Sequence, residues 1–442
     1  MTGLGWHSFG IVPTLRIHFG LGQKAKGKRQ CGDRGRLRYD MPPVSDDVPL
    51  IPLAIGSQSI AAQDAENPGG FVHIPALDGI RGLAVLMVLF DHLFWSNPVT
   101  GNRIFDLLNA IREASYVGVN LFFALSGFLI TGILLDTLNT PRFFANFYAR
   151  RTLRIFPLYY GLLLVLLLLT RPLHFVWSGW QYYYLTYTSN LALWRSHVPL
   201  VLGRFNINHF WSLQVEEQFY LIWPFIVYRV RRPLTLVRIS LVSCGVILGI
   251  RIFLVAMRGQ PGFDNIYLPY SPTFSCADNI LFGCCLCALL RSGWSKFVVR
   301  FAPRVLAVSA GILLIAAVRN HGLDFATSTF VPTIGFSLVG ICCAAIIAMT
   351  LKTGSKTQWL FKNGALRFFG KYSYGIYVFH YSLDGFFSGP IRASMNAHFH
   401  NKALSVVAGA FVVGVASVLI ALLSYHLYEV RFLKLKKYFS YR

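Results

Sequence analysis

The chain alternates between apolar stretches long enough to cross a lipid bilayer and short polar connections. A helix that spans the hydrocarbon core needs about 20 predominantly apolar residues. From Ile74 onward we expect ten such spans, at 75–96, 116–136, 155–171, 210–228, 236–257, 271–290, 304–319, 330–351, 371–389 and 403–428. The sequence therefore predicts an all-α integral membrane protein with about ten transmembrane helices.

One further segment, 175–195, is rich in aromatic side chains, among them Trp177, Trp180 and Tyr182. It could form an eleventh span. Trp and Tyr concentrate at membrane–water interfaces, so we favour an interfacial or re-entrant segment. Its rings could also stack on the faces of sugars.

The excess of positive charge is the second constraint on this chain. Of 442 residues, 41 are Lys or Arg and only 18 are Asp or Glu, which gives a formal net charge of +23. Such an excess is typical of nucleic-acid-binding proteins. However, only 13% of the residues are charged, about half of the usual share. The apolar bulk therefore argues for a lipid bilayer as the partner and against nucleic acid.

The position of the basic residues along the chain predicts its topology. With ten spans, 22 Lys and Arg fall on one set of alternate connections together with the C-terminal tail, and nine fall on the other set. Cytoplasmic loops of membrane proteins are enriched in Lys and Arg. We therefore expect both termini in the cytoplasm and a multi-pass protein of the cell (inner, cytoplasmic) membrane.

The first part of the chain, 1–72, is a polar and basic N-terminal extension. Its positions 1–40 hold eight Lys and Arg, and they lack the apolar core and cleavage site of a secretory signal peptide. Two interpretations stay open: a disordered basic arm, or a start codon assigned too early, with Met41 as the true start. We expect the transmembrane domain over 73–430 and a basic cytoplasmic tail over 431–442.

The cysteines do not indicate a metal centre. Seven of the eight fall within the expected spans. Cys284 and Cys287 form a CxxC pair, but neither a second pair nor a histidine at metal-ligand spacing accompanies it. We expect these cysteines to act as small buried side chains, with no metal and no disulfide framework.

The first span contains four ionisable residues, Asp78, Arg81, Asp91 and His92, which are costly in a bilayer and are functional candidates for that reason. At about 100° per residue, Arg81 and His92 share one face, about 16 Å apart along the axis. Asp78 lies on the same stripe and can pair with Arg81, whereas Asp91 points away from His92. The structural alternatives are an ion pair at the membrane boundary and, for His92, a polar link between helices.

Two further polar clusters lie at the ends of later spans. Arg151 and Arg154 form an i,i+3 fork suited to phosphate, with positive-inside anchoring as the alternative. Glu216 and Glu217 are adjacent carboxylates at the outer end of the fourth span. They would repel each other unless one is paired or protonated, and solvation of both at the interface is the alternative.

The expected orientation places these groups at different depths in the membrane. Arg81 lies near the cytoplasmic face, whereas His92 and Glu216 lie in the outer half of the membrane, and His380 lies near the middle of the ninth span. Cationic groups inside and an acid–base pair outside suit an anionic cytoplasmic donor and a neutral acceptor that carries a hydroxyl group.

Five blocks of the sequence resemble the acyltransferase-3 family of integral membrane acyltransferases. In chain order they are Leu77–Ala84 with His92, Gly118–Ile130, Arg151–Pro157, Phe210–Tyr220 and Ser373–His380. The resemblance implies ten transmembrane helices and O-acylation of glycans or of some small molecules. Some members carry an additional extracytoplasmic hydrolase-like domain, and the short tail leads us to expect none here.

The resemblance also implies roles for the matching residues. The donor is an acyl-CoA, most often acetyl-CoA, and the acceptor is a sugar hydroxyl. Arg151 and Arg154 would bind the phosphates of coenzyme A, with Arg81 deeper, near the pantetheine or thioester. His92 would be a general base or a transient acyl carrier, and the sequence leaves both roles open.

The remaining candidates support these residues. Glu216 would orient His92 or bind the acceptor, and Asp78 would fix Arg81. Other residues of the five blocks are candidates for substrate binding or for structural roles, namely Ser126, Trp211, Glu217, Tyr377 and His380.

A different class of function competes with acyl transfer. Transporters and flippases of polar or glycan-like solutes also contain buried charged residues. They need no coenzyme, so the binding of acyl-CoA discriminates between the two classes. The acceptor stays open among O-antigen of lipopolysaccharide, exopolysaccharide, peptidoglycan precursor, glycolipid and secondary metabolite.

Overall fold

The computed structural model describes residues 73–95, 103–172, 174, 182–195, 201–202, 205–260, 262–263, 265–320, 322–324 and 328–441. All of them belong to one of the chain's two compact units, Asp46–Arg442. The N-terminal extension 1–72 with Met41, and Trp177 and Trp180 of the aromatic segment, lie outside the described residues.

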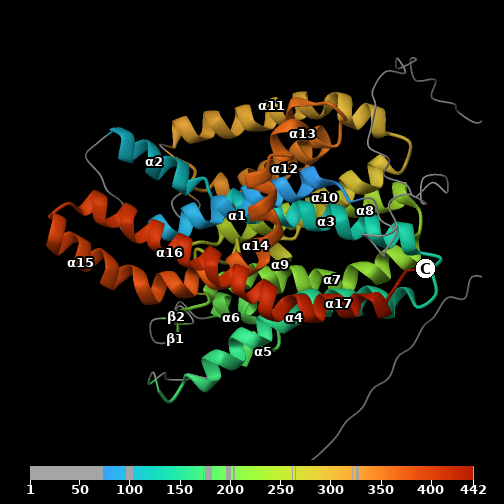
Figure 1. Ribbon diagram of the computed structural model, residues 1–442. Coiled ribbons are helices and arrows are strands. Elements are labelled where there is room, and N and C mark those ends of the chain that lie inside the picture. The colour runs from blue at the N-terminus through green and yellow to red at the C-terminus, as the bar shows by residue number, and fades with distance from the viewer. Residues whose placement is uncertain are drawn as a thin grey trace, which may run out of the picture. The chain divides into compact units, whose positions relative to one another are not determined.

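Long helices make up most of the described chain (Figure 1). They are α1 (Pro75–Trp95), α3 (Val117–Thr137), α4 (Phe143–Leu168), α7 (Trp211–Val230), α8 (Pro233–Ala256), α10 (Asp278–Leu290), α11 (Ser295–Arg319), α12 (Phe336–Thr350), α14 (Gly364–Leu383) and α16 (Lys402–Ser424). Each of the ten expected spans overlaps one of these helices, although several of the helices begin or end outside the expected bounds.

Shorter elements connect the long helices. The helical ones are α2 (Arg103–Glu113), α5 (Tyr182–Leu185), α6 (Ser189–Arg195), α9 (Thr273–Cys276), α13 (Lys356–Phe361), α15 (Gly389–Phe399) and α17 (Val430–Lys434). Two strands, β1 (Val201–Leu202) and β2 (Phe205–Asn206), form an antiparallel pair. A 3-10 turn, Asn208–Phe210, leads into α7, and another, Leu435–Tyr438, follows α17.

Six helical stretches of the described chain are long and apolar enough to cross a membrane. They are Leu107–Thr137, Phe143–Leu168, Pro233–Ala256, Ser295–Arg319, Val331–Thr350 and Lys402–Tyr438. Helix α10 is apolar but shorter, and α1, α7 and α14 each contain charged residues within their sequence. The all-α membrane fold is confirmed, whereas the count of about ten spans and the cytoplasmic position of the termini stay predictions.

Helices α1 and α14 lie in direct backbone contact. A Cβ atom on Gly82 would lie 1.9 Å from the carbonyl oxygen of Leu366, and one on Gly370 would lie 1.8 Å from that of Asp78. The two helices run parallel, because ten residues after this glycine contact His92 meets His380. Glycine therefore sets both the separation and the register of this pair.

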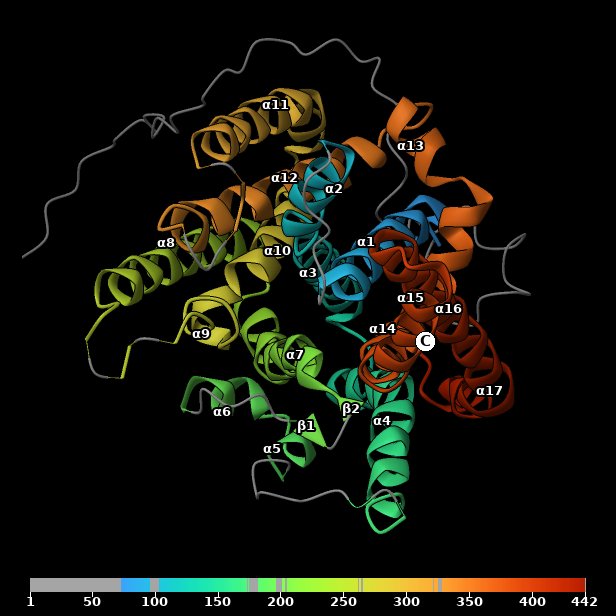
Figure 2. The same cartoon turned by 90° about the vertical axis from the view of Figure 1, so that its left-hand side faces the viewer.

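A second pair of helices is packed in the same way. Gly127 of α3 and Gly283 of α10 lie against each other's helix, with Cβ positions 1.9 Å from the carbonyl oxygens of Ile280 and Ala124. Small residues at such crossings let membrane helices approach closely. Figure 2 looks along several helices and shows α1, α3, α7, α4 and α14 around a common centre.

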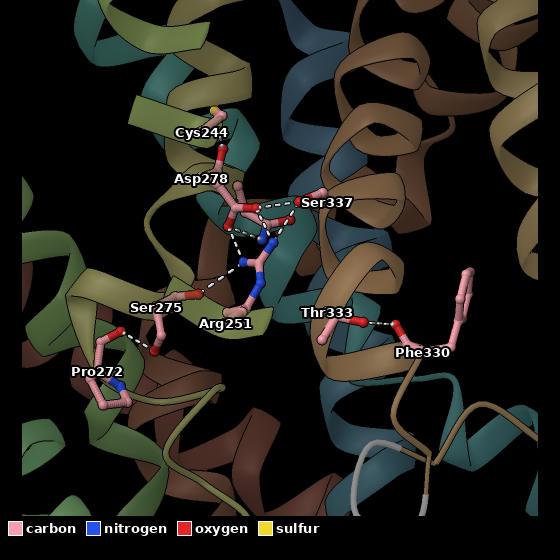
Figure 3. A network of polar contacts seen from close by, with 9 residues as sticks. Cys244, Arg251, Pro272, Ser275, Asp278, Phe330, Thr333 and Ser337 are labelled. Atoms are coloured by element: carbon pink, nitrogen blue, oxygen red, sulfur yellow. Dashed lines mark hydrogen bonds and ion pairs between the residues drawn. The ribbon is translucent and has the colours of Figure 1, made fainter. Parts of the chain in front are cut away.

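A buried ion pair joins α8, α9, α10 and α12 away from that centre (Figure 3). Arg251 donates two parallel hydrogen bonds to Asp278, Nη1 to Oδ1 at 2.8 Å and Nη2 to Oδ2 at 2.6 Å. Its Nη1 also donates to the carbonyl oxygen of Ser275, and its Nη2 to the hydroxyl of Ser337, which in turn donates to Asp278. Both charged side chains are fully buried, so each depends on the other for compensation.

Replacement of Asp278 by Asn should destabilise the fold strongly, because it leaves the Arg251 charge buried without its counter-ion. Breaking a buried pair in this way costs about 3 to 5 kcal/mol. Thermal unfolding of the detergent-purified protein measures the effect. The double variant Arg251→Met, Asp278→Leu removes both charges and should regain most of the lost stability. An Asp278→Asn variant that melts with the wild type would contradict this role.

Candidate functional site

A cavity of about 140 Å³, here called the narrow cavity, lies between α1, α3, α4, α7 and α14. Its polar lining comes from all five helices and consists of Arg81, Ser126, Arg151, Arg154, Ser212, Glu216, Tyr220, Ser373, Tyr374 and Tyr377. Apolar side chains, most of them from α3, complete the wall. Candidate residues from five separate blocks of the sequence therefore meet in one place.

Helical periodicity explains why these side chains point the same way. On α7, Ser212, Glu216 and Tyr220 follow one another at i,i+4 spacing and form one stripe. On α14, Tyr377 and His380 continue the stripe that starts at Ser373.

A second cavity of about 520 Å³, here called the basic cavity, adjoins the first. Its lining contains seven Lys and Arg side chains: Arg81, Arg150, Arg151, Arg154, Arg367, Lys371 and Lys436. Among acidic groups, only Asp78 contributes to the described lining. Arg81, Arg151 and Arg154 line both cavities, so these three arginines form the boundary between a strongly cationic space and a narrower polar and aromatic one.

The predicted pair of Asp78 and Arg81 is confirmed. Nη1 of Arg81 donates to Oδ1 of Asp78 at 2.8 Å, and the ring of His73 lies 2.6 Å from the other carboxylate oxygen. Because Asp78 is held on one turn of α1 by both partners, it fixes the direction of the Arg81 guanidinium at the cavity boundary.

The C-terminal residues form part of the basic cavity. Within this segment, α17 and the following 3-10 turn pack against α4. Arg150 donates to the carbonyl oxygens of Lys436 and Phe439, at 3.2 and 3.3 Å, and Asn146 donates to that of Ser440 at 2.7 Å. These bonds hold the Lys436 side chain at the cavity wall, 282 positions after Arg154 in the sequence.

Glu216 is part of a chain of hydroxyl groups in the narrow cavity. The phenol of Tyr220 donates to its Oε2 at 3.3 Å, and Ser126 hydrogen-bonds the same phenol. Arg151 lies over the Tyr220 ring, 5.5 Å from its centre. Glu217 is not part of the described lining of the narrow cavity, and its Oε1 is buried without a hydrogen-bond partner among the described residues.

Three histidines lie together beyond the narrow cavity. Nδ1 of His92 is 2.8 Å from Nε2 of His380, and Nδ1 of His380 is 2.8 Å from the carbonyl oxygen of Tyr377. His209 lies close to both, with ring centres 6.4 Å from His92 and 4.9 Å from His380. Tyr381 stacks on His92 at 4.4 Å between ring centres.

Tyr377 connects the histidines to the narrow cavity. Its phenol lines that cavity and donates to the carbonyl oxygen of His209 at 2.9 Å, while its own carbonyl oxygen accepts from His380. Along α1, the cluster is about 16 Å from Arg81. The site is therefore a column that runs from the basic cavity through the three arginines to the histidines.

The structure corrects one predicted contact. Glu216 was expected either to orient His92 or to bind the acceptor, but the hydrogen-bond partner of His92 in the described chain is His380, on α14. Asp91 points away from His92, as predicted, and lies 3.8 Å from Arg112. The physical reason is the parallel packing of α1 on α14, which brings His380 to His92.

Trp211 lies outside the cavity. It packs on Tyr270, with 4.7 Å between ring centres, and edge-on against Phe123 at 6.1 Å. Its role is therefore to pack the start of α7 against its neighbours.

Several residues of the site were not predicted from the sequence. His209 precedes α7, and its burial gives the strongest structural signal: both ring nitrogens are buried without a hydrogen-bond partner in the part of the chain described. His209 thus adds a third buried imidazole beside His92 and His380. Lys436 and Arg367 had no local pattern that could have marked them.

A comparison with protein families places the chain among known proteins. The model of the family described as an acyltransferase domain matches residues 74–426. The chain therefore belongs to the acyltransferase-3 family, which confirms the resemblance of the five blocks.

Individual relatives agree with this assignment. The chain is 28% identical over 335 residues to the peptidoglycan O-acetyltransferase OatA of Listeria monocytogenes, covering 70% of this chain and 49% of that protein. It is 27% identical over 394 residues to the putative peptidoglycan O-acetyltransferase YrhL of Bacillus subtilis, with 81% and 54% covered. A putative O-acetyltransferase of Staphylococcus aureus is 28% identical over 342 residues, with 71% and 51% covered. The chain thus spans about half the length of these relatives, and no solved structure matches it.

Replacement of Gly82 by Ala should separate α1 from α14, because the new Cβ would overlap the carbonyl oxygen of Leu366. We expect a loss of about 1 to 3 kcal/mol of stability, as for other overpacked contacts, and loss of the His92–His380 hydrogen bond. Thermal unfolding in detergent and the ¹⁵N resonances of the histidine rings measure the two effects. Gly245→Ala on α8 is the matched control, since a Cβ there meets no atom within 4 Å. Equal behaviour of the two variants would refute the role of this contact.

Proposed function

We propose that the protein is a membrane-embedded O-acyltransferase that moves an acyl group, with acetyl as the expected one, from acyl-CoA to a hydroxyl group of a glycan. The observation that carries the proposal is the column of the site: a cationic cavity, three boundary arginines, a narrow polar cavity and a histidine pair in series. Family membership supports the same class of reaction.

The basic cavity fits the phosphates of coenzyme A. Guanidinium groups match phosphate oxygens in a bidentate way, and a pyrophosphate together with a 3′-phosphate calls for several cations within one space. We assign this binding to Arg151, Arg154 and Lys436, which line the cavity. Arg81, at the boundary of the two cavities, would contact the arm that leads to the thioester.

His92 supplies the acid–base chemistry in this proposal. Its ring accepts the proton of the acceptor hydroxyl while the hydroxyl oxygen forms a bond to the acyl carbon. The carbon–sulfur bond breaks, and the same ring returns the proton to the departing sulfur, so that His92 ends neutral and coenzyme A leaves as a thiol. In the alternative role, His92 itself carries the acyl group between two such steps.

Glu216 belongs to substrate binding rather than to the activation of His92. Its carboxylate is held by Tyr220 and faces the narrow cavity, through which the acyl end of the donor would pass. A carboxylate at this point accepts hydrogen bonds from amide or hydroxyl groups of a substrate.

The location and the acceptor follow from the charge distribution and from the relatives. We propose the cytoplasmic membrane, with the basic cavity on the cytoplasmic side, where acyl-CoA is made, and the histidines in the outer half. Two relatives carry names that specify peptidoglycan, which makes the glycan strands of peptidoglycan the first acceptor to test.

Replacement of His92 by Ala should lower acyl transfer by about 10²-fold to 10⁴-fold, the range for a lost general base. Proteoliposomes with [1-¹⁴C]acetyl-CoA and peptidoglycan fragments measure transfer, and equilibrium binding of the same donor should stay near the wild-type value. His398→Ala on the exposed face of α15 is the matched control. Wild-type transfer by the His92 variant would overturn the assignment. Flux of a solute without binding of acetyl-CoA would favour a transporter instead.

The double variant Arg151→Ala, Arg154→Ala should weaken donor binding by at least about 10-fold, because charge-assisted bonds to phosphate are lost. Equilibrium binding of acetyl-CoA and of 3′-dephospho-acetyl-CoA shows whether the two arginines bind the 3′-phosphate. If these arginines hold the 3′-phosphate, its removal should weaken binding to the wild type and leave binding to the variant nearly unchanged. Arg300→Ala on the exposed side of α11 serves as the control. Unchanged donor affinity would show that the two arginines only set topology.

A further inference from the structure

We propose that His380 is a positioning residue that holds the ring of His92 in one tautomer, with the proton on Nδ1 and a free electron pair on Nε2. The inference rests on the proposed function, which needs His92 as a base or nucleophile, and it names the atom that does the chemistry.

The direction of the hydrogen bonds starts at the backbone of α14. Nδ1 of His380 lies 2.8 Å from the carbonyl oxygen of Tyr377 and 3.2 Å from that of Ile376. A carbonyl oxygen only accepts hydrogen bonds. Nδ1 of His380 must therefore be the donor and carry a proton.

The other nitrogen of His380, Nε2, carries no proton. This ring is fully buried, and none of its hydrogen bonds in the described chain involves a carboxylate. A buried charge without a partner is costly, so the ring is neutral and carries a single proton. Since that proton is on Nδ1, Nε2 of His380 is an acceptor.

The tautomer of His92 follows from this acceptor. Its Nδ1 lies 2.8 Å from Nε2 of His380 and must donate the proton of this bond. A neutral His92 then has no proton on Nε2, and this nitrogen presents its electron pair on the side of the ring away from His380. The general base and the acyl carrier both need that electron pair, so the assignment holds for either role.

Two contacts keep the His92 ring in place. Tyr381 stacks on it with 27° between the ring planes, and the glycine contact of α1 with α14 fixes the height of His92 relative to His380. His92 is only partly buried, in contrast to His380. The free nitrogen therefore belongs to the less buried of the two rings.

A pair of isosteric variants separates this role from packing. Gln at position 380 can place an amide oxygen where Nε2 of His380 lies, because both atoms are the same number of bonds from Cα. Asn is shorter and reaches only the position of Nδ1. We expect His380→Gln to keep kcat within about 3-fold of the wild type, and His380→Asn to lower kcat by at least about 10-fold, with KM for acetyl-CoA unchanged in both.

The tautomer itself is read from ¹⁵N-histidine-labelled protein in detergent, without substrate. The His92 signals are assigned by their loss in His92→Gln. We expect a protonated Nδ1 and an unprotonated Nε2 in the wild type and in His380→Gln, and a mixture of tautomers in His380→Asn. A proton on Nε2 of His92 in the wild type, or equal kcat values for the Gln and Asn variants, would overturn the proposal.

These measurements distinguish failure of the proposed function from failure of the positioning role. If the protein does not transfer acyl groups, the wild type lacks activity although the tautomer is as expected. If only the positioning role is wrong, the wild type is active and His92→Ala is not, while His380→Asn transfers acyl groups like the wild type.

Discussion

The backbone contact between α1 and α14 is the constraint on which the site depends. Without a side chain at Gly82 and Gly370, the two helices approach until a carbonyl oxygen of one helix occupies the place of a Cβ on the other. Because the helices run parallel, this single crossing sets the register along their whole common length. It decides the separation of His92 and His380, which are 288 positions apart in the sequence, and it keeps Arg81 beside α14 at the other end.

Local spacing made part of this site predictable from the sequence. The pair of Asp78 and Arg81, the fork of Arg151 and Arg154, and the divergence of Asp91 from His92 all depend on helical periodicity alone, and the structure has all three. The apolar stretches located the helices for the same reason. Periodicity within one helix does not determine which other helix packs against it. The partner of His92 is His380 because of how two helices cross, and no spacing within either helix contains that information.

The site residues that were not predicted also owe their positions to packing between distant parts of the chain. Lys436 enters the basic cavity because Arg150 and Asn146 hold the C-terminal backbone against α4. In the sequence it is one of several lysines in a basic run. His209 directly precedes the block Phe210–Tyr220 in the sequence, but its place beside His92 and His380 is a result of the fold. Arg251 was recognisable as a charge within a span, while its compensation by Asp278 needed the packing of α8 on α10.

The docking of the C-terminal residues on α4 has a consequence for biosynthesis. The three boundary arginines all precede α5, whereas His380 on α14 and the wall residue Lys436 are made more than 200 residues later. A partly translated chain thus has the boundary arginines of the basic cavity without Lys436, and a His92 ring without its hydrogen-bond partner His380. The basic cavity therefore gains Lys436, and His92 gains its hydrogen-bond partner, only after these later segments have been made and packed against the earlier ones.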